Sequence, residues 1–339
     1  MTIKELAKIA GLNHSTVSRS INDSPLISEE TKKRVLELAK EHSFEPNASA
    51  RGLITKKTGT IGVIVPALND AYRNLQYLGS LMNSIRYTIE DYQYDSIITF
   101  PKNPKTGRSN IRKLIQQRKV DGLLLVIQDI DRDDWKILTE SGLPFVSLHF
   151  KWQNELQGNI NYVYPDNFKG GYLAAECLLD AGCREILCLT QAGGVYEFNE
   201  RVRGYKAALA GRGIEPKEEN IFYGISGFDY GYNFVMENRK LLTRIDGIFA
   251  QADMIAIGAI EAMKELGIKI PQEIAVVGYD DVDINYFFKP RLTTIHQPRE
   301  RHAEIACCRL IELINKDEGS EMVQMVIEPS LLIRESCVV

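Results

Sequence analysis

A short run of polar side chains near the N-terminus has the composition of a surface that reads DNA. From about Ser15 to Asn22 the sequence favours a helix in which Val17 and Ile21 point inward. Short polar side chains allow a helix to approach the major groove closely, and an arginine can donate two hydrogen bonds to one guanine. A solvated helix face would explain any one of these residues equally well, but the group as a whole favours DNA. The outward residues are His14, Ser15, Thr16, Ser18 and Arg19.

Two further helices must position this helix from about Ser15 to Asn22, which we call the reading helix. Thr2 is a suitable N-cap for a first helix, which we expect to end at Gly11, because glycine readily adopts the positive φ of a helix end. A third helix is expected to begin at Ser28, where the sequence resembles a capping box. Its apolar residues are Val35, Leu36, Leu38 and Ala39. Three short helices can close one small core, so the sequence predicts a helix-turn-helix domain.

The charge of the chain is divided between its two ends. The whole chain carries a net charge of -4, which alone would argue against nucleic acid. Residues 1–58, however, contain ten Lys and Arg against seven Asp and Glu, a charge of +3, while the remaining 31 basic and 38 acidic side chains give -7. A basic N-terminal segment on an acidic body suits a segment that neutralises phosphates.

The composition is that of an ordinary globular protein. At 339 residues the chain is long enough for several domains, and no apolar run approaches the roughly 18 residues of a membrane helix. No secretory signal is visible, so we expect a cytoplasmic protein. The six cysteines form no zinc-binding spacing, and we expect buried thiols and no metal or cofactor. They are Cys177, Cys183, Cys188, Cys307, Cys308 and Cys337.

From Thr60 onward, short β-branched runs alternate with helical patterns. Apolar strands separated by helices indicate parallel sheets covered on both faces. The runs are too many for one sheet, and the alternation restarts near Tyr164, so we expect an α/β body of two doubly wound lobes. The runs are TIGVIV, DSIITF, DGLLLVI, PFVSLHF, EILCLT, GIFA and EIAVVGYDD.

The N-terminal sequence resembles the LacI/GalR family of bacterial repressors. The resemblance rests on TIKELAKIAGLNHSTVSRSIN, then SEETKKRVLELAKEHSFEPNASARGL, then TGTIGVIVP, in the family's order and spacing. It implies that His14, Ser15 and Arg19 read bases. It also implies phosphate contacts, from Thr2, Thr16, Ser18 and Asn22.

The segment Pro46–Leu53 is too short for a stable isolated helix, and we expect it to fold only on DNA. By resemblance it is a hinge helix that enters the minor groove beside that of a second subunit, with Leu53 inserted between base pairs. Asn47 and Ala50 are counted among its DNA contacts. A plain flexible linker is the alternative, but it would leave the exposed Leu53 without a purpose.

The resemblance also implies a body of the periplasmic-binding-protein type I fold. We expect a DNA-binding domain over 1–45, a hinge over 46–58 and an effector-binding and dimerisation domain over 59–339. The chain should cross between the lobes near 155–165, 288–296 and 318–326. The N-lobe would comprise about 59–160 and 294–322, and the C-lobe about 161–293 and 323–339.

Ligands of such folds lie at the carboxyl ends of the strands, so residues that follow strands are the candidates for a binding site. By resemblance, Arg201 and Asp280 occupy the positions of an arginine and an aspartate that contact the effector. Both side chains can bond two adjacent hydroxyl groups, which suits a sugar. The expected effector-binding residues are Asp70, Tyr72, His149, Phe150, Glu197, Arg201, Asp253 and Asp280.

The sequence favours a repressor of carbohydrate-use genes over three alternatives to different degrees. An enzyme is disfavoured because the sequence lacks G-x-G-x-x-G after a strand, G-x-x-x-x-G-K-[ST], G-x-S-x-G and H-E-x-x-H. A sugar-transport receptor would need a signal peptide. Control by a partner protein, such as a phosphorylated carrier, or by a metabolite other than a sugar stays open. We expect a homodimer that binds near-palindromic operator DNA.

Overall fold

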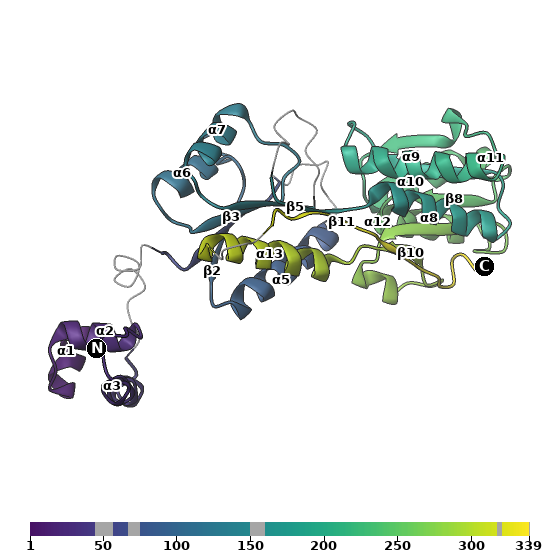
Figure 1. Cartoon of the computed structure of the whole chain (residues 1–339). Helices are drawn as coiled ribbons and strands as arrows, with labels where there is room; N and C mark the ends of the chain where they lie inside the picture. Colours follow the sequence, from purple (N-terminus) through teal and green to yellow (C-terminus); the bar gives the residue numbers. More distant parts are fainter. Residues whose placement is uncertain (45–56, 67–74, 150–159, 317–320, 339) are drawn as a thin grey trace. The chain divides into compact units, whose positions relative to one another are not determined.

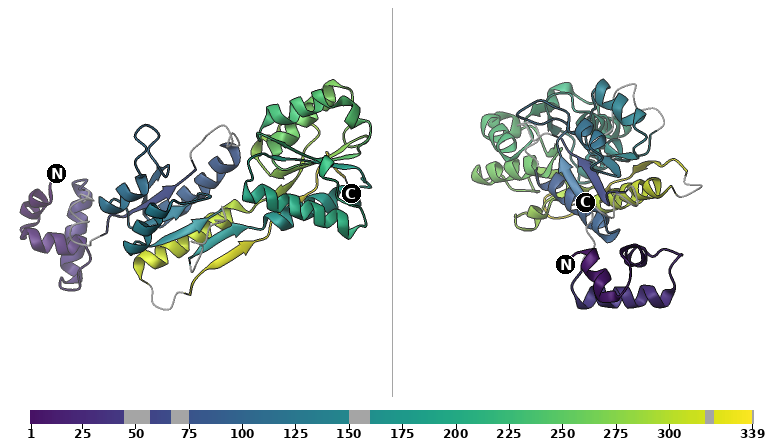
Figure 2. Two further views of the ribbon diagram at one scale, coloured as in Figure 1. Left: turned by 90° about the horizontal axis from the view of Figure 1, so that it is seen from above. Right: turned by 90° about the vertical axis from the view of Figure 1, so that its left-hand side faces the viewer.

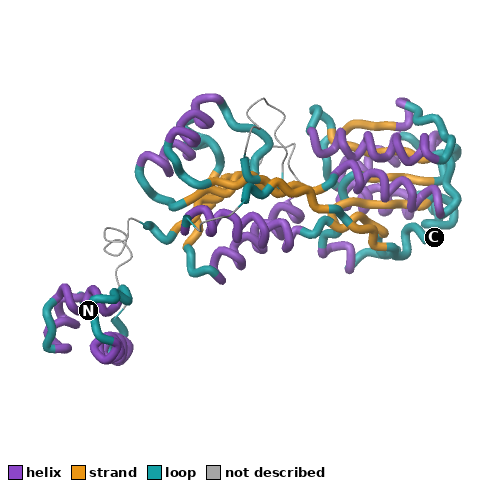
Figure 3. The backbone as a smooth tube through the Cα atoms, in the orientation of Figure 1, coloured by secondary structure: helices purple, strands orange, loops and turns teal. Residues whose placement is uncertain are grey.

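The computed structural model describes residues 1–44, 57–66, 75–149, 160–316 and 321–338. The chain forms two compact units, Met1–Gly59 and Thr60–Val339. Figure 1 labels the elements of both, and Figure 3 shows that the strands of the described residues lie in the second unit.

In its described part, the N-terminal unit contains three helices, α1 (Ile3–Ala10), α2 (His14–Ile21) and α3 (Glu29–Glu41). Thr2 caps α1 in a capping box with Glu5, and Gly11 ends it with a φ of 67°. The helix α2 begins one residue earlier than expected because Asn13 caps it. The core of this unit consists of Leu6, Ala7, Ala10, Val17, Val35 and Ala39.

The third helix differs from the expectation at one residue. Ser28 caps α3 as predicted, since its hydroxyl accepts a hydrogen bond from N of Thr31. Leu36, however, is 51% exposed, because it lies beside the face of α3 that Val35 and Ala39 bury in the core. An apolar residue type alone did not reveal which face of the helix it occupies.

The N-lobe of the second unit is a parallel sheet of six strands in the order β11-β5-β4-β3-β1-β2. Its strands are β1 (Thr60–Ile64), β2 (Asp95–Thr99), β3 (Gly122–Leu125), β4 (Phe145–Leu148), β5 (Tyr162–Pro165) and β11 (Gln324–Ile327). The helices α5 (Leu75–Asp91) and α13 (Arg299–Asn315) cover one face, and α6 (Asn110–Gln116) and α7 (Arg132–Glu140) cover the other (Figure 1).

The C-lobe has the sheet order β12-β10-β9-β8-β6-β7, with β12 antiparallel to β10. Its strands are β6 (Ile186–Gln191), β7 (Ile221–Gly224), β8 (Gly247–Ala250), β9 (Ala275–Asp280), β10 (Thr293–His296) and β12 (Ser330–Leu332). Its helices are α8 (Asn167–Asp180), α9 (Tyr196–Gly211), α10 (Phe228–Glu237), α11 (Arg239–Leu242) and α12 (Asp253–Glu265), with 3-10 turns at Glu218–Asn220 and Asp283–Tyr286. Two apolar cores lie on opposite faces of this sheet, one under α8 and α9 and one under α10 and α12, so both lobes are doubly wound (Figure 2).

The chain passes between the lobes a few residues later than the sequence predicted. The strand β5 pairs with β4 and β11, so it belongs to the N-lobe, and the first crossing follows Pro165 rather than residue 160. The second crossing lies between β10 and α13, after His296 instead of residue 293. The third lies between β11 and β12, which moves residues 324–327 from the C-lobe to the N-lobe. The reason is that strand pairing over long sequence separations, not local pattern, decides to which sheet a strand belongs.

Five of the six cysteines are buried, Cys308 is partly exposed, and all six are free thiols, with 3.6 Å between the sulfur atoms of Cys177 and Cys337. Among the described residues, no helix is both long enough and apolar enough to span a bilayer.

Candidate functional site

The outward face of α2 carries the side chains that the sequence assigns to DNA bases. His14, Ser15 and Arg19 are exposed, whereas Thr16 and Ser18 are half-buried. The Asn13 side chain accepts hydrogen bonds from N of Thr16 at 2.8 Å and from its hydroxyl at 2.9 Å. This cap fixes the first turn of the helix, and with it the position of His14 and Ser15.

Thr2 and Asn22, the remaining expected phosphate contacts in this unit, lie at helix ends. The hydroxyl of Thr2 accepts a hydrogen bond from N of Glu5, and Nδ2 of Asn22 donates to the carbonyl of Ser18 at 2.7 Å. Both side chains are exposed. A helix N-terminus presents free backbone N–H groups, which suits the phosphate contact expected near Thr2.

Sequence reasoning missed two polar groups that support α2. Ser20 is buried, and its hydroxyl donates to the carbonyl of Thr16 at 2.8 Å. The Lys32 side chain reaches back from α3 to Asp23 at 2.7 Å, just beyond the end of α2. The sequence signal for the Ser20 contact was a Ser one helical turn after a Thr. The contact between Lys32 and Asp23 depends on tertiary structure and has no such signal.

Several expected site residues lie outside the described residues, and their roles stay predictions. They are Asn47, Ala50 and Leu53 in the hinge segment and Asp70, Tyr72 and Phe150 in the body.

Arg201 is buried in the C-lobe, where only 4% of it is exposed. Its Nε donates to Oδ1 of Asn167 at 2.9 Å, and one terminal nitrogen donates to the backbone carbonyl of Gln251 at 2.7 Å. The guanidinium also lies 3.7 Å from the centre of the Tyr279 ring, a cation–π contact. Contacts from α8, from the residue that follows β8 and from β9 therefore fix this side chain.

A close approach of two helices determines where Arg201 lies. A Cβ atom at Gly171 in α8 would come within 2.0 Å of the carbonyl oxygen of Arg201 in α9. A Cβ at Gly204 in α9 would be equally close to the carbonyl oxygen of Phe168. Only glycine permits this helix contact, which brings Asn167 within reach of Arg201.

Asp280 ends β9 in a strained turn. Asp280 and Asp281 have φ values of 114° and 52°, a region in which residues other than glycine are uncommon. The Asp280 carboxylate accepts a hydrogen bond from Nε2 of Gln297 at 2.8 Å, and its carbonyl accepts one from Arg299 at 3.0 Å. Strain of this kind is typical of functional turns.

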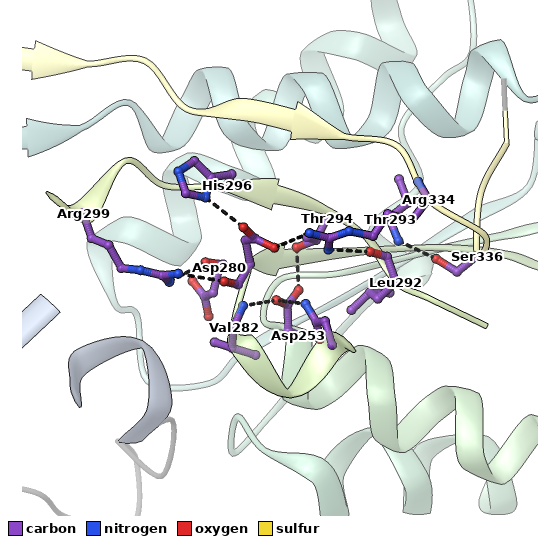
Figure 4. A network of polar contacts seen from close by, with 12 residues as sticks. Asp253, Asp280, Val282, Leu292, Thr293, Thr294, His296, Arg299, Arg334 and Ser336 are labelled. Carbon is purple, nitrogen blue, oxygen red and sulfur yellow. Dashed lines mark hydrogen bonds and ion pairs between the residues drawn. The ribbon is translucent and has the colours of Figure 1, made fainter. Parts of the chain in front are cut away.

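Asp253 is placed differently from what the sequence led us to expect. It is fully buried, and its carboxylate accepts hydrogen bonds from N of Val282, Nδ2 of Asn285 and the hydroxyl of Thr294 (Figure 4). Burial, with the nearby Asp280, raises its pKa to about 7. Asp253 thus stabilises the strained turn through hydrogen bonds to the residues that follow it, and its carboxylate is directed into the C-lobe.

Asp281 anchors the other side of the same turn. Its carboxylate contacts Nδ1 of His296 at 2.9 Å and the guanidinium of Arg334 at 2.7 Å, as Figure 4 shows. Although burial opposes it, the hydrogen bonds from His296 and Arg334 lower the pKa of Asp281. The turn after β9 is therefore tied to β10 and to the C-terminal segment.

Two N-lobe rings lie close to these C-lobe groups. His149 follows β4 and is buried, and its Nδ1 is 3.3 Å from the hydroxyl of Tyr77 in α5. Burial, helped by His302 and Arg201, holds the pKa of His149 well below its usual value, so the ring is neutral. Burial also raises the pKa of Tyr77, and Asp280 adds to the shift. The Arg299 guanidinium lies 5.7 Å from the centre of the Tyr77 ring.

Glu197 forms a direct contact between the lobes. It lies in the first turn of α9, is 2% exposed, and accepts a hydrogen bond from Nε2 of Gln128 at 3.3 Å. Gln128 follows β3 of the N-lobe. Because Glu197 and Arg201 are four residues apart, they share one face of α9.

The structure thus brings His149, Glu197, Arg201 and Asp280 to the surfaces where the lobes meet, and keeps Asp253 behind them. Sequence reasoning missed the partners of these residues because most lie far away in the chain. A signal was available for Gln128, Asn167 and Gln297, which follow strands as the expected residues do. The missed partners are Tyr77, Gln128, Asn167, Tyr279, Gln297 and Arg299.

Comparison with known proteins gives consistent matches over the whole chain. Residues 2–47 match the family model of bacterial regulatory proteins, lacI family, and residues 175–337 match that of a periplasmic binding protein-like domain. The ribose operon repressor of Haemophilus influenzae is 32% identical, with 99% of this chain and 98% of that protein covered.

Two solved structures are similar as well. A complex of the transcriptional regulator CelR with cellobiose has a TM-score of 0.70 and 27% identity, and 99% of each chain is covered. A LacI family transcriptional regulator from Enterococcus faecium with bound ribose has the same TM-score and identity, with 82% of this chain and 98% of the other covered.

Proposed function

The chain belongs to the lacI family of bacterial regulatory proteins, and we propose that it represses carbohydrate-use genes by binding operator DNA under the control of a sugar-like effector. The observation that carries this proposal is the presence, in one chain, of an exposed reading helix and a two-lobed body with buried Arg201 and Asp280 where the lobes meet. Relatives whose structures contain cellobiose or ribose favour a sugar as the effector.

The residue roles form part of the proposal. His14, Ser15 and Arg19 would read bases, and Thr2, Thr16, Ser18 and Asn22 would contact phosphates. His149, Glu197, Arg201 and Asp280 would surround the effector. We also propose that the protein is cytoplasmic and acts as a homodimer on a near-palindromic site, because the two N-terminal units of a dimer match two half-sites.

The switch follows from two states of the body. An effector that binds between the lobes changes their closure, and this change would strengthen or weaken the pairing of the hinge segments on DNA. If the effector binds one state 100-fold more tightly, the coupling is about 2.7 kcal/mol, which is enough to change operator occupancy.

A binding experiment tests the proposal. Selection from random DNA with the full chain would define the operator, and fluorescence anisotropy of that DNA would then be followed during titration with ribose, cellobiose and other sugars. We expect at least one sugar to change the operator affinity by tenfold or more, and Arg201→Met to abolish the response while preserving DNA binding without sugar. Failure of every metabolite to change DNA affinity would refute control by a small molecule.

A further inference from the structure

Two buried thiols of the C-lobe lie in contact. The sulfur atoms of Cys177, in α8, and Cys337, which follows β12, are 3.6 Å apart although the two residues are 160 positions apart in the chain. The Cys337 sulfur also lies 3.8 Å from the backbone carbonyl oxygen of Cys177. A disulfide requires about 2.05 Å between its sulfur atoms, so an approach of about 1.5 Å would join this pair.

Exposure alone would favour a different thiol. Cys308 in α13 is partly exposed, and its sulfur lies 3.2 Å from the hydroxyl of Tyr92. Cys177 and Cys337 are 2% and 0% exposed, but Val338, the neighbour of Cys337, is 58% exposed. Local opening of a segment next to the surface admits a small oxidant such as hydrogen peroxide or diamide. The buried pair thus combines a route for the oxidant with a second thiol in contact.

The two thiols differ in their readiness to lose a proton. A hydrogen bond from the Cys337 thiol lowers the pKa of Cys177, although burial opposes this shift. The same hydrogen bond, together with burial, raises the pKa of Cys337. The thiolate is the form of cysteine that reacts with an oxidant, so Cys177 would attack first and Cys337 would follow as the second thiol.

The segment that carries Cys337 supports the strained turn after β9. The guanidinium of Arg334 donates to Oδ1 of Asp281 in this turn at 2.7 Å (Figure 4). The hydroxyl of Ser336 donates to the carbonyl of Val276 in β9 at 2.7 Å. The position of residues 334–337 therefore affects the position of the turn.

The helix α8, which carries Cys177, supports Arg201. It begins at Asn167, whose Oδ1 accepts a hydrogen bond from Nε of Arg201 at 2.9 Å. A bond between the sulfur atoms of Cys177 and Cys337 would consequently join the helix that holds Arg201 to the segment that holds the turn of Asp280.

We propose that Cys177 and Cys337 are a site of reversible oxidation, at which a peroxide or another thiol oxidant forms a disulfide between α8 and the segment 334–337. With hydrogen peroxide, the Cys177 thiolate attacks one oxygen, the O–O bond breaks, and the departing hydroxide takes up a proton and becomes water. The Cys337 thiol then attacks the sulfenic acid on Cys177, and the hydroxyl group leaves with the thiol proton as a second water while the S–S bond forms. The two sulfur atoms lose two electrons, which the peroxide gains.

A peptide map of the oxidised full chain tests the proposal. The native protein would be treated with hydrogen peroxide or diamide, its remaining thiols blocked with N-ethylmaleimide during denaturation in urea, and tryptic digests compared with and without dithiothreitol. We expect the peptide 170–184 to be linked to the peptide that begins at Glu335, and dithiothreitol to remove the link. Free thiols at both Cys177 and Cys337 after Cys308 has been fully oxidised would overturn the proposal.

Cys183 is the matched control, because the peptide 170–184 also contains it. It belongs to the same apolar core, but its thiol donates to the carbonyl of Asp246 at 3.2 Å. Cys183→Ser should keep the link to Cys337, and Cys177→Ser should remove it. Fragmentation of the linked wild-type peptide identifies the bonded sulfur without any variant. A bond to Cys183 in place of Cys177 would refute the proposal.

Thermal unfolding shows whether the native fold accepts the bond. A disulfide that closes so long a loop restricts the unfolded chain strongly, so oxidation should raise the unfolding midpoint of the wild type by about 5 °C or more. The same treatment of Cys337→Ala should leave its midpoint unchanged. An oxidised wild type with an unchanged or lower midpoint would show that the bond does not fit the native structure, and would overturn the proposal.

The effect of oxidation on ligand binding rests on the proposed function, because it concerns Arg201 and the turn of Asp280. We expect the affinities of the reduced and the oxidised full chain for a sugar that changes operator binding to differ by about fivefold or more in calorimetric titration. Equal affinities would overturn the coupling between the thiol pair and the turn. If the disulfide forms but neither form binds a sugar, the sugar-controlled function fails while the oxidation site stands.

Discussion

His302 lies in α13 and is fully buried. Burial lowers its pKa to about 4, and the backbone groups of Pro298 and Tyr164 oppose this shift only in part. A histidine that is held neutral in the folded state takes up protons more readily after unfolding. It therefore stabilises the fold above pH 6.5, and this contribution is lost as the pH falls towards 4.

Replacement of His302 by Gln should make the free energy of unfolding depend less on pH below about 6.5. With a pKa near 6.5 when unfolded and about 4 when folded, this residue accounts for a loss of about 2 kcal/mol between pH 8 and pH 5. Urea unfolding followed by tryptophan fluorescence at several pH values would measure the difference between H302Q and the wild type. Parallel profiles of the two proteins would contradict the buried, neutral state of His302.

Asp253 should change the free energy of unfolding with pH in the opposite direction. Its pKa is raised to about 7 in the fold, chiefly by burial, so the protonated form is favoured and stability falls as the pH rises from about 4 to 7. Between pH 5 and pH 8 this amounts to roughly 2–3 kcal/mol. In Asp253→Asn this pH-dependent part should disappear, although the lost acceptor oxygen destabilises the variant at every pH. A D253N profile that still falls over this range as steeply as the wild type would show that another group titrates.

Asp253 also shows what the sequence could not predict about single residues. Its place after a strand correctly located it near the carboxyl edge of the sheet, but the direction of the carboxylate depends on Asn285 and Thr294, which lie 32 and 41 residues further along. Arg201 and Asp280 were found through a family motif. Tyr77, which belongs to another lobe and another helix, has no such signal.

At the scale of elements, the contact between α8 and α9 is the most sensitive to substitution. An alanine at Gly171 would place its Cβ 2.0 Å from the carbonyl oxygen of Arg201, which cannot move without its helix. We expect Gly171→Ala to destabilise the body by about 1–3 kcal/mol or more, and to weaken effector binding because Arg201 shifts.

The matched control is Gly211, at the end of α9, where a Cβ meets nothing within 4 Å. Gly211→Ala should leave the stability unchanged or raise it by up to about 1 kcal/mol, because alanine favours a helix. Urea unfolding measures both variants. Equal effects of the two substitutions would exclude helix packing as the cause.

The alternation of apolar runs with helical patterns predicted two doubly wound lobes, because strands and helices have different periods. The boundaries of the lobes were harder to predict from the sequence. The run Tyr162–Pro165 looked like the start of the C-lobe, yet β5 pairs with β11 across more than 150 residues. Pairing at such separation leaves no local pattern in the sequence.

At the scale of the whole molecule, the two compact units carry opposite net charge. The body, from Thr60 onward, has its own cores in both lobes, and residues 1–59 have a separate small core. Ligand binding and DNA binding therefore belong to units that fold on separate cores, and the hinge segment is the covalent link between them.

Removal of residues 1–58 should consequently separate the two activities. The truncated chain keeps every described residue of the lobes, including Arg201 and Asp280, so its sugar affinity should remain within about threefold of the full chain. Its affinity for operator should fall by at least 100-fold, since the reading helix is gone and the remaining chain is strongly acidic. Calorimetric titration and fluorescence anisotropy measure the two affinities. Operator binding that survives the truncation would contradict the assignment of DNA recognition to α2, whereas loss of sugar binding together with intact unfolding cooperativity would place part of the effector site in the N-terminal unit.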